Sequence, residues 1–108
     1  MSDSRRSKWY RQRKKRGFDD RELWSFDHTI AKFVLPRLIS FKEKKIGYPA
    51  DLTMEKWDSI LDEIIYSMQA ICDEWAGADM DLDFFISNDK KVRKGLKLFG
   101  EYFRNLWW

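Results

Sequence analysis

The sequence predicts an all-α fold, a small three-helix domain with a possible fourth helix, preceded by a basic N-terminal arm. Apolar residues recur at helical spacing in three segments, residues that start and stop helices flank those segments, and no segment alternates as a strand would. A chain of 108 residues has the length of one domain and can bury roughly two thirds of its unfolded surface. We therefore divide the chain into a basic arm, residues 1–17, and a helical domain, residues 18–108.

The predicted arm differs from the rest of the chain in its charge. The first eighteen residues hold eight Lys and Arg residues against one acid, Asp3, so this segment carries +7. Because the whole chain carries +3, residues 19–108 carry −4. A short helix can begin at Ser7 and stop at Gly17, although repulsion between like charges four residues apart weakens such a helix in isolation.

The first helical segment of the domain begins near Asp19, whose spacing to Glu22 is typical of a capping box. A short turn there is followed by a longer apolar stripe. Pro36 lies within the stripe and predicts a kink and not an end, because the stripe keeps its phase across the proline. The helix should end in the basic run 42–45, where cations suit the negative end of the helix dipole. The stripe consists of Ile30, Phe33, Val34, Leu38 and Phe41.

The second helical segment has the clearest amphipathic pattern. Thr53 is a favourable N-cap residue, and Gly77 is the natural residue to follow the last turn. Acidic residues fill the positions opposite the apolar ones, as expected for a helix with one buried face. The apolar positions are Trp57, Ile60, Leu61, Ile64, Ile65, Met68, Ile71, Cys72 and Trp75.

The third helical segment follows an acidic and ambiguous stretch, residues 78–88. Ser87 or Asn88 is expected to cap this helix. Gly95 and Gly100 lie in its interior, where glycine is unfavourable, so we expect a neighbouring helix to approach closely at both positions. Its apolar residues form a narrow seam, which consists of Val92, Leu96, Phe99, Phe103 and Leu106.

The apolar surface of this last segment leaves the oligomeric state open. The seam can pair with a copy of itself in a symmetric dimer, or it can pack between the other two helices of the same chain. The terminal pair Trp107–Trp108 is expected to dock on the helical core, and the alternative is an exposed patch for a partner. The sequence therefore favours neither a monomer nor a homo-oligomer.

The residues that could carry catalysis or bind a metal lack the necessary partners. Cys72 is the only cysteine and His28 the only histidine, so neither a disulfide nor a zinc site can be assembled. The segment 79–83 has the spacing of a calcium loop, but Phe84 and Lys90 stand where that loop needs Gly and Glu. No phosphate loop, serine elbow or paired-carboxylate motif is present. We therefore expect a non-enzymatic protein that uses no cofactor and no metal.

The same observations bear on location. A single thiol is typical of a reducing compartment. No apolar run approaches the roughly 18 residues that span a bilayer, and no apolar stretch follows the basic N-terminus as it would in a secretory signal. We expect a cytoplasmic protein without a membrane partner.

The basic arm is the candidate binding site. Its cations can neutralise phosphates and release counterions, and its two aromatic rings can stack on unpaired bases. The arm therefore predicts a partner that is nucleic acid or a phosphorylated ligand. Two other interpretations stay open: a solubility tail, or rings that fold back and complete the domain. The candidate site residues are Arg5, Arg6, Lys8, Trp9, Tyr10, Arg11, Arg13, Lys14, Lys15 and Arg16.

The helical domain resembles a family of small uncharacterised proteins encoded by tailed bacteriophages. Three segments carry the resemblance: GFDDRELWSFDHTIAKFVLPRLISFKEKK, MEKWDSILDEIIYSM and GLKLFGEYFRNLWW. It covers residues 17–108 and not the basic arm. The resemblance implies a setting, the cytoplasm of an infected bacterium, and supplies no catalytic residues. The matching positions are Gly17, Phe18, Leu23, Trp24, Pro36, Arg37, Leu38, Trp57, Gly95, Leu96, Leu98 and Phe99.

Two functions follow as expectations. The first is a phage-encoded binding protein whose arm engages nucleic acid or a nucleotide, in host takeover or in defence against host immunity. The alternative is a protein–protein interaction module that inhibits or adapts a host or phage protein. The aromatic content of 17% suits the second function, because aromatic anchors dominate the binding energy of protein interfaces. The phage setting supports either one by analogy.

Overall fold

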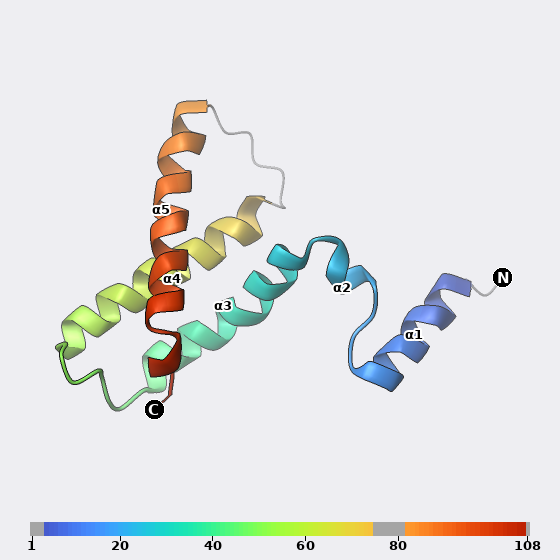
Figure 1. Cartoon of the computed structure of the whole chain (residues 1–108), viewed down its shortest axis with the longest axis horizontal. Helices are drawn as coiled ribbons and strands as arrows, with labels where there is room; N and C mark the ends of the chain where they lie inside the picture. The colour runs from blue at the N-terminus through green and yellow to red at the C-terminus, as the bar shows by residue number, and fades with distance from the viewer. Residues whose placement is uncertain (1–3, 75–81, 108) are drawn as a thin grey trace.

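A computed structural model of the chain describes residues 4–74 and 82–107, and every regular element in these residues is helical (Figure 1). The prediction of an all-α fold is therefore confirmed. None of the described helices combines the length and the apolarity needed to cross a membrane. The elements are α1 (Ser4–Arg16), α2 (Arg21–Trp24), α3 (Phe26–Lys44), α4 (Met54–Glu74), α5 (Leu82–Glu101) and the short 3₁₀ helix η1 (Phe103–Asn105).

The three long helices α3, α4 and α5 form the body, and α4 packs against both of the others (Figure 1). Most of the buried core comes from α4, on the face that its apolar spacing predicts. Burial of this face stabilises the fold because it removes large apolar side chains from water. The cluster of buried core residues consists of Ala31, Leu38, Trp57, Leu61, Ile64 and Met68.

Helix α3 continues through Pro36 and does not end there, as the sequence predicts, and the kink at Pro36 stays a prediction. It ends at Lys44, within the expected basic run, and two cations there tie it to α4. The Lys42 ammonium lies 2.7 Å from the Asp62 carboxylate. Lys45 pairs in the same way with Asp58. The end of α3 is thus fixed to the first half of α4.

The N-terminus of α4 has the predicted cap. The Thr53 hydroxyl accepts a hydrogen bond from the Lys56 amide at 3.2 Å. One turn later Trp57 is only 1% exposed, and its ring lies 5.6 Å from that of Tyr102, which follows α5. The predicted end of this helix at Gly77 lies outside the described residues.

Helix α5 begins earlier than the sequence predicts. It starts at Leu82, so Ser87 and Asn88 are interior residues and neither caps the helix. The Asn88 side chain is buried, and its carbonyl oxygen accepts a hydrogen bond from the Tyr66 hydroxyl of α4. This partner satisfies the amide inside the fold, which removes the usual cost of an asparagine within a helix.

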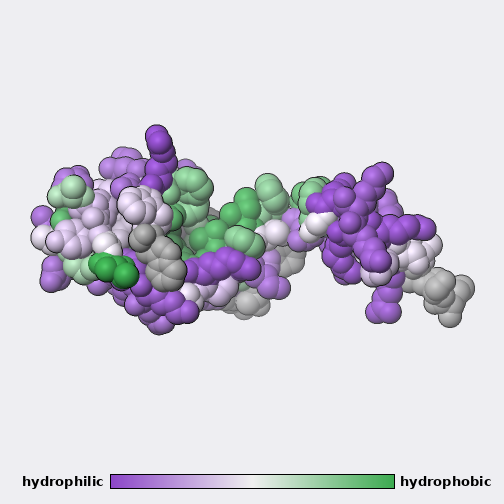
Figure 2. All heavy atoms as spheres, turned by 90° about the horizontal axis from the view of Figure 1, so that it is seen from below, coloured by the Kyte–Doolittle hydropathy of each residue, from purple (hydrophilic) through white to green (hydrophobic). Residues whose placement is uncertain are grey.

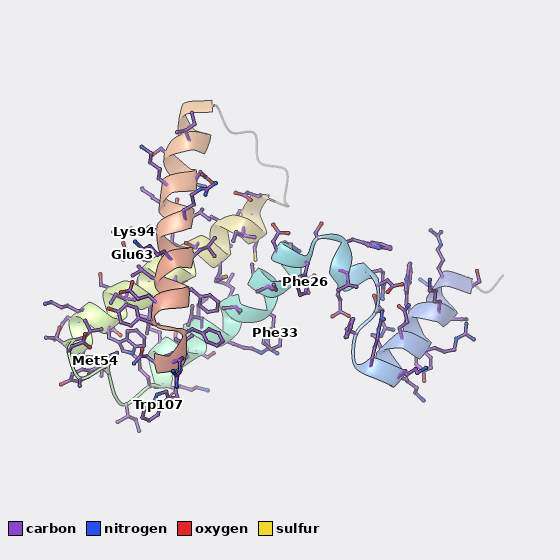
Figure 3. All side chains as sticks on the ribbon, in the orientation of Figure 1. Phe26, Phe33, Met54, Glu63, Lys94 and Trp107 are labelled. Atoms are coloured by element: carbon purple, nitrogen blue, oxygen red, sulfur yellow. The ribbon has the colours of Figure 1, made fainter. Side chains whose placement is uncertain are left out.

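The two glycines of α5 differ in their surroundings. A Cβ at Gly95 would lie 1.8 Å from Ser67 Oγ and 2.4 Å from the carbonyl oxygen of Glu63, so the predicted close approach is confirmed there. A Cβ at Gly100 would have no neighbour within 4 Å, and the prediction of tight packing is wrong at this position. Gly100 lies next to the last residue of α5, beyond its contact with α4 at Gly95. Glu63 lies one turn before Ser67 on α4, and its carboxylate pairs with the Lys94 ammonium of α5 at 2.8 Å (Figure 3).

The C-terminal residues divide between the core and the surface. Val92 is buried, and Phe99 and Leu106 pack partly against the core, so these seam residues are used within the chain. Trp107 is 74% exposed, so the expectation that it docks on the core is wrong. Leu106 takes the position against the core, and the next residue along the chain extends outward. Trp108 lies outside the described residues.

The molecule is more extended than its length requires. Its radius of gyration is 17.3 Å, compared with about 13 Å for a compact chain of this size. Figure 1 shows the reason: α1 lies beyond the N-terminal end of α3, away from the three-helix body. The principal extents of 57 × 38 × 20 Å describe the same elongation.

Candidate functional site

The basic segment forms α1, a helix of 13 residues. The helix begins at Ser4, one turn before the predicted start at Ser7, and it ends at Arg16. Gly17 then adopts a φ of 85°, a left-handed conformation that favours glycine, and its amide donates to the Arg13 carbonyl at 2.9 Å. The predicted stop at Gly17 is confirmed, and the reversal brings residues 18–20 back beside α1.

A buried carboxylate, Asp19, holds one side of α1 against the start of α2. Asp19 is 2% exposed, and its Oδ2 accepts hydrogen bonds at 2.9 Å from both Arg13 and Arg21. The bond from the Arg21 side chain lowers the pKa of Asp19 to about 2. The Asp19 amide donates to the Glu22 carboxylate at 2.7 Å, as the capping-box spacing predicts. Asp19 thus links α1 and α2 while its charge is fully paired.

The next residue, Asp20, binds the same side of α1. It accepts hydrogen bonds from Gln12 at 2.9 Å and from Arg16 at 2.7 Å, and Lys8 lies 3.6 Å away. The hydrogen bond from Gln12, with a further one from Arg16, lowers the pKa of Asp20. Lys8, Arg13 and Arg16 therefore have acidic partners within the chain.

The two aromatic residues of α1 have different surroundings. The half-buried Trp9 ring meets Trp24 edge-on at 6.0 Å between ring centroids. The Arg21 guanidinium lies 4.2 Å from the centre of the same Trp9 ring. Trp9 therefore helps to hold α1 in place, whereas Tyr10 is 53% exposed on another side of the helix. The interpretation in which the rings fold back fits Trp9 and not Tyr10.

The side of α1 that faces away from Asp19 and Asp20 is called here the outer side. At 100° per residue Tyr10 and Lys14 lie opposite Lys8, Gln12 and Arg16, Arg6 and Arg11 flank them, and Lys15 lies beside Lys8 at the edge of this side. Among the described residues, no acid forms an ion pair with its four cations. Helix α1 forms the hydrophilic end of the molecule in Figure 2. The outer side consists of Arg6, Tyr10, Arg11, Lys14 and Lys15.

The outer side is open and shallow. Arg6, Ser7, Tyr10 and Arg11 line a hollow of about 400 Å³. The Lys14 ammonium lies 5.2 Å from the centre of the Tyr10 ring, so a cation and an aromatic face are offered together. Arg5 is also exposed, but its position one turn from Lys8 and Trp9 places it on the docked side of the helix.

A cleft of about 600 Å³ lies between the α1–α2 region and α3. Its wall on α3 carries Lys32 and Arg37, and the Arg37 guanidinium lies 3.8 Å from the centre of the Phe33 ring. Basic side chains thus continue from α1 towards α3. The sequence did not assign Lys32, Arg37 or Arg21 to the candidate binding site, since only the fold brings them near α1. The cleft is lined by Arg13, Gly17, Asp19, Arg21, Glu22, His28, Thr29, Lys32, Phe33 and Arg37.

Of the groups considered for other chemistry, His28 lines this cleft and Cys72 lies elsewhere. Cys72 is half-buried among core residues of α4, and burial raises the pKa of its thiol, which keeps the thiol protonated near neutral pH. Residues 79–81 of the calcium-like spacing lie outside the described residues.

Comparison with protein-family models, with curated proteins and with solved structures finds no match to this chain. The functional argument therefore rests on the geometry of α1 and its surroundings.

Proposed function

We propose that this chain is a non-enzymatic binding protein that engages nucleic acid through the outer side of α1. The observation that carries the proposal is the division of α1 into two sides. One side is neutralised by Asp19 and Asp20, and the other presents Arg6, Arg11, Lys14, Lys15 and the exposed Tyr10 to solvent.

The docked side makes the outer side more effective as a binding surface. An isolated helix of this length and charge would be marginal in water, and ordering it on binding would reduce the affinity. Here the contacts of Asp19 and Asp20 hold the helix before a ligand arrives. The four outer cations are then already held on an ordered helix.

The spread of the outer cations favours a polymer over a single nucleotide. Arg6 and Lys15 are nine residues apart, which corresponds to about 13 Å along a helix axis. The hollow beside Arg6 and Tyr10 is open, and a small ligand usually binds in a cavity that surrounds it. A chain of phosphates can contact several of these cations at once. Tyr10 adds an exposed ring on which one unpaired base can stack.

The test is a titration of labelled single-stranded and double-stranded DNA and RNA, followed by fluorescence anisotropy, with ATP as a single-nucleotide competitor. Four phosphate contacts give a salt slope of about −3.6, so affinity should fall about a hundredfold between about 50 and 200 mM salt. A variant in which Arg6, Arg11, Lys14 and Lys15 are all Gln should lose this salt dependence. Removal of residues 1–16 should have the same effect.

The matched control removes four charges from the body: Lys56→Gln, Lys90→Gln, Lys97→Gln and Arg104→Gln. All four residues are exposed. Both quadruple variants have the same net charge, so only a site on α1 makes them differ. Equal weakening by both variants would reduce the binding to non-specific charge. Negligible binding by the unaltered protein would rule out nucleic acid as the ligand.

A protein partner is the second candidate function, and the observation that favours it is the exposed apolar surface on α2 and α3. Trp24 is 69% exposed and Phe33 is 59% exposed. In the phage setting that the sequence resemblance suggests, such a partner would be a host or phage protein. Affinity capture with and without the α1 substitutions separates this function from nucleic-acid binding.

A further inference from the structure

Helix α3 has an apolar ridge that the rest of the chain leaves uncovered. Phe26, Ile30 and Phe33 are 55%, 41% and 59% exposed and recur at i, i+4 and i+7 on one side of the helix. Figure 2 shows hydrophobic atoms at the surface between the body and the hydrophilic α1. Leu23 and Trp24 of α2 extend the exposed apolar surface beyond the start of the ridge. A monomer seldom leaves so many large apolar side chains together in water.

The same side of α3 carries a hollow further along the helix. This hollow has a volume of about 410 Å³ and is lined by Ser40, Phe41, Lys44, Leu106 and Trp107. At 100° per residue, the α3 residues of the hollow lie in the same mean direction as the ridge. Figure 3 shows Phe33 and Trp107 on the same edge of α3. One face of α3 therefore carries an apolar ridge in its first half and an apolar hollow in its second.

The solvent-accessible area of the chain is larger than that of a compact monomer of the same mass. The accessible area is 8449 Å², whereas a folded monomer of 13.2 kDa exposes about 6,400 Å². The excess is roughly 2,000 Å². A stable interface needs about 800 Å² from each partner, which is less than half of this excess, to which the protruding α1 also contributes.

We infer that the chain forms a two-fold symmetric dimer through this face of α3, with the ridge of each copy seated in the hollow of the other. In a two-fold interface the same patch faces itself, so a patch that contains both a ridge and a hollow is self-complementary. An antiparallel arrangement about an axis near Pro36 places Phe33 opposite Ser40 of the other copy. It also places Ile30 near the level of Phe41, which lines the hollow. This dimer goes beyond the proposed function and does not depend on it.

The charges on this face define how the dimer responds to salt. Arg37 lies close to the axis in each copy, and Lys44 lines the hollow. Asp27, on the first turn of α3, lies opposite the end of the partner helix and can meet Lys44 at the rim. The two Arg37 side chains repel each other, and salt screens that repulsion. Apolar contacts do not weaken in salt, so the dimer should persist or tighten at high ionic strength.

The face of α3 is a better dimer interface than the seam on α5. Of the seam on α5 that the sequence offers for self-pairing, Val92 is buried and Phe99 packs against the core of its own chain. Phe103 is 59% exposed, the same fraction as Phe33. These two phenylalanines therefore serve as a matched pair of substitutions, one on each candidate interface.

The test is sedimentation velocity from about 1 to 100 μM protein, in 0.1 and 1 M NaCl. We expect a species of twice 13.2 kDa that persists at the higher salt. Phe33→Gln should raise the dissociation constant of the dimer at least about tenfold, because a central aromatic anchor dominates an interface. Phe103→Gln should leave it unchanged. A monomer at every concentration, or a dimer that Phe103→Gln disrupts and Phe33→Gln does not, would overturn the inference.

Cross-linking provides a second measurement that does not depend on how Phe33→Gln folds. In a Cys72→Ser background, Arg37→Cys should form an intermolecular disulfide under mild oxidation, because its two copies lie near the axis. Arg93→Cys is the control, since Arg93 is an exposed residue of α5 away from this face. Equal cross-linking of the two cysteine variants would show that the proposed axis is wrong.

Discussion

At the scale of single residues, one buried carboxylate determines where α1 lies. Asp19 is nearly inaccessible, yet it is charged, because Arg13 and Arg21 both donate to it. The spacing of Asp19 and Glu22 identified the start of α2 from the sequence. No sequence signal indicated that Arg13 would reach Asp19, since that contact depends on the reversal of the chain at Gly17.

Replacement of Asp19 by Asn should release α1 from α2. An amide cannot offer two charged acceptor oxygens to the guanidiniums of Arg13 and Arg21. We expect amide hydrogen exchange in residues 4–16 to accelerate several-fold while exchange in α4 stays the same. Equal acceleration in both helices would mean that Asp19 supports the whole fold and not the position of α1.

Acid should have the same effect on the unaltered protein. The pKa of Asp19 is lowered in the folded chain to about 2, from an ordinary value of 3.8. Because the pKa is lower in the folded chain, the ionised Asp19 carboxylate stabilises the docked helix above about pH 4. This contribution is lost as the pH falls from about 4 towards 2. Tryptophan emission reports the change, because release of α1 separates Trp9 from Trp24. An emission spectrum that stays constant over this pH range, with the protein still folded, would contradict this prediction.

Trp57 should contribute most to the stability of the core. It is 1% exposed, begins the buried face of α4 and contacts Tyr102. Trp57→Ala should lower the free energy of unfolding by about 3–5 kcal/mol. A urea titration measures this loss, and a value below about 1 kcal/mol would contradict the burial of Trp57.

At the scale of elements, the sequence predicted the helices whose apolar spacing is regular and misplaced the starts of α1 and α5. The buried face of α4 was predictable because each apolar residue falls on one stripe. The start of α5 was not, because Ser87 and Asn88 resemble cap residues, and only the contact between Asn88 and Tyr66 shows why an asparagine is stable inside that helix. The division of α1 into two sides was equally hidden, since it depends on Asp19 and Asp20.

The packing of α4 against α5 depends on the absence of a side chain at Gly95. Gly95→Ala should lower the free energy of unfolding by about 1–3 kcal/mol, because its methyl group would overlap Ser67 and the backbone of Glu63. Gly100→Ala is the matched control on the same helix. It should be neutral or stabilise by up to about 1 kcal/mol, because the space there is open and alanine favours a helix. Thermal unfolding of the two variants should shift in opposite directions, and destabilisation of equal size would contradict the contact at Gly95.

At the scale of the whole molecule, the proposed binding surface and the buried core occupy different parts of the chain. None of the residues of α1 is buried, while the core lies in α3 and α4. Sequence composition indicated this separation through the charge of the first eighteen residues. The exposed ridge on α3 was not predictable, because Ile30 and Phe33 share helical spacing with the residues that are buried.

Removal of residues 1–17 should therefore leave the body folded. We expect the free energy of unfolding to change by no more than about 1 kcal/mol, since surface contacts of this kind contribute little each. Urea titration of the two forms, at a concentration where their oligomeric states match, measures the difference. A loss above about 3 kcal/mol would show that α1 is part of the cooperative fold.

The two sides of α1 share a single helix, and this imposes a constraint on its length. One residue inserted after Tyr10 would rotate the two halves of the helix by about 100° relative to each other. Trp9 could then no longer face Trp24 while Arg13 reaches Asp19. Insertions of three or four residues restore nearly a full turn and would keep both contacts in phase. Chains related to this one should therefore vary in the length of this helix by whole turns and not by single residues.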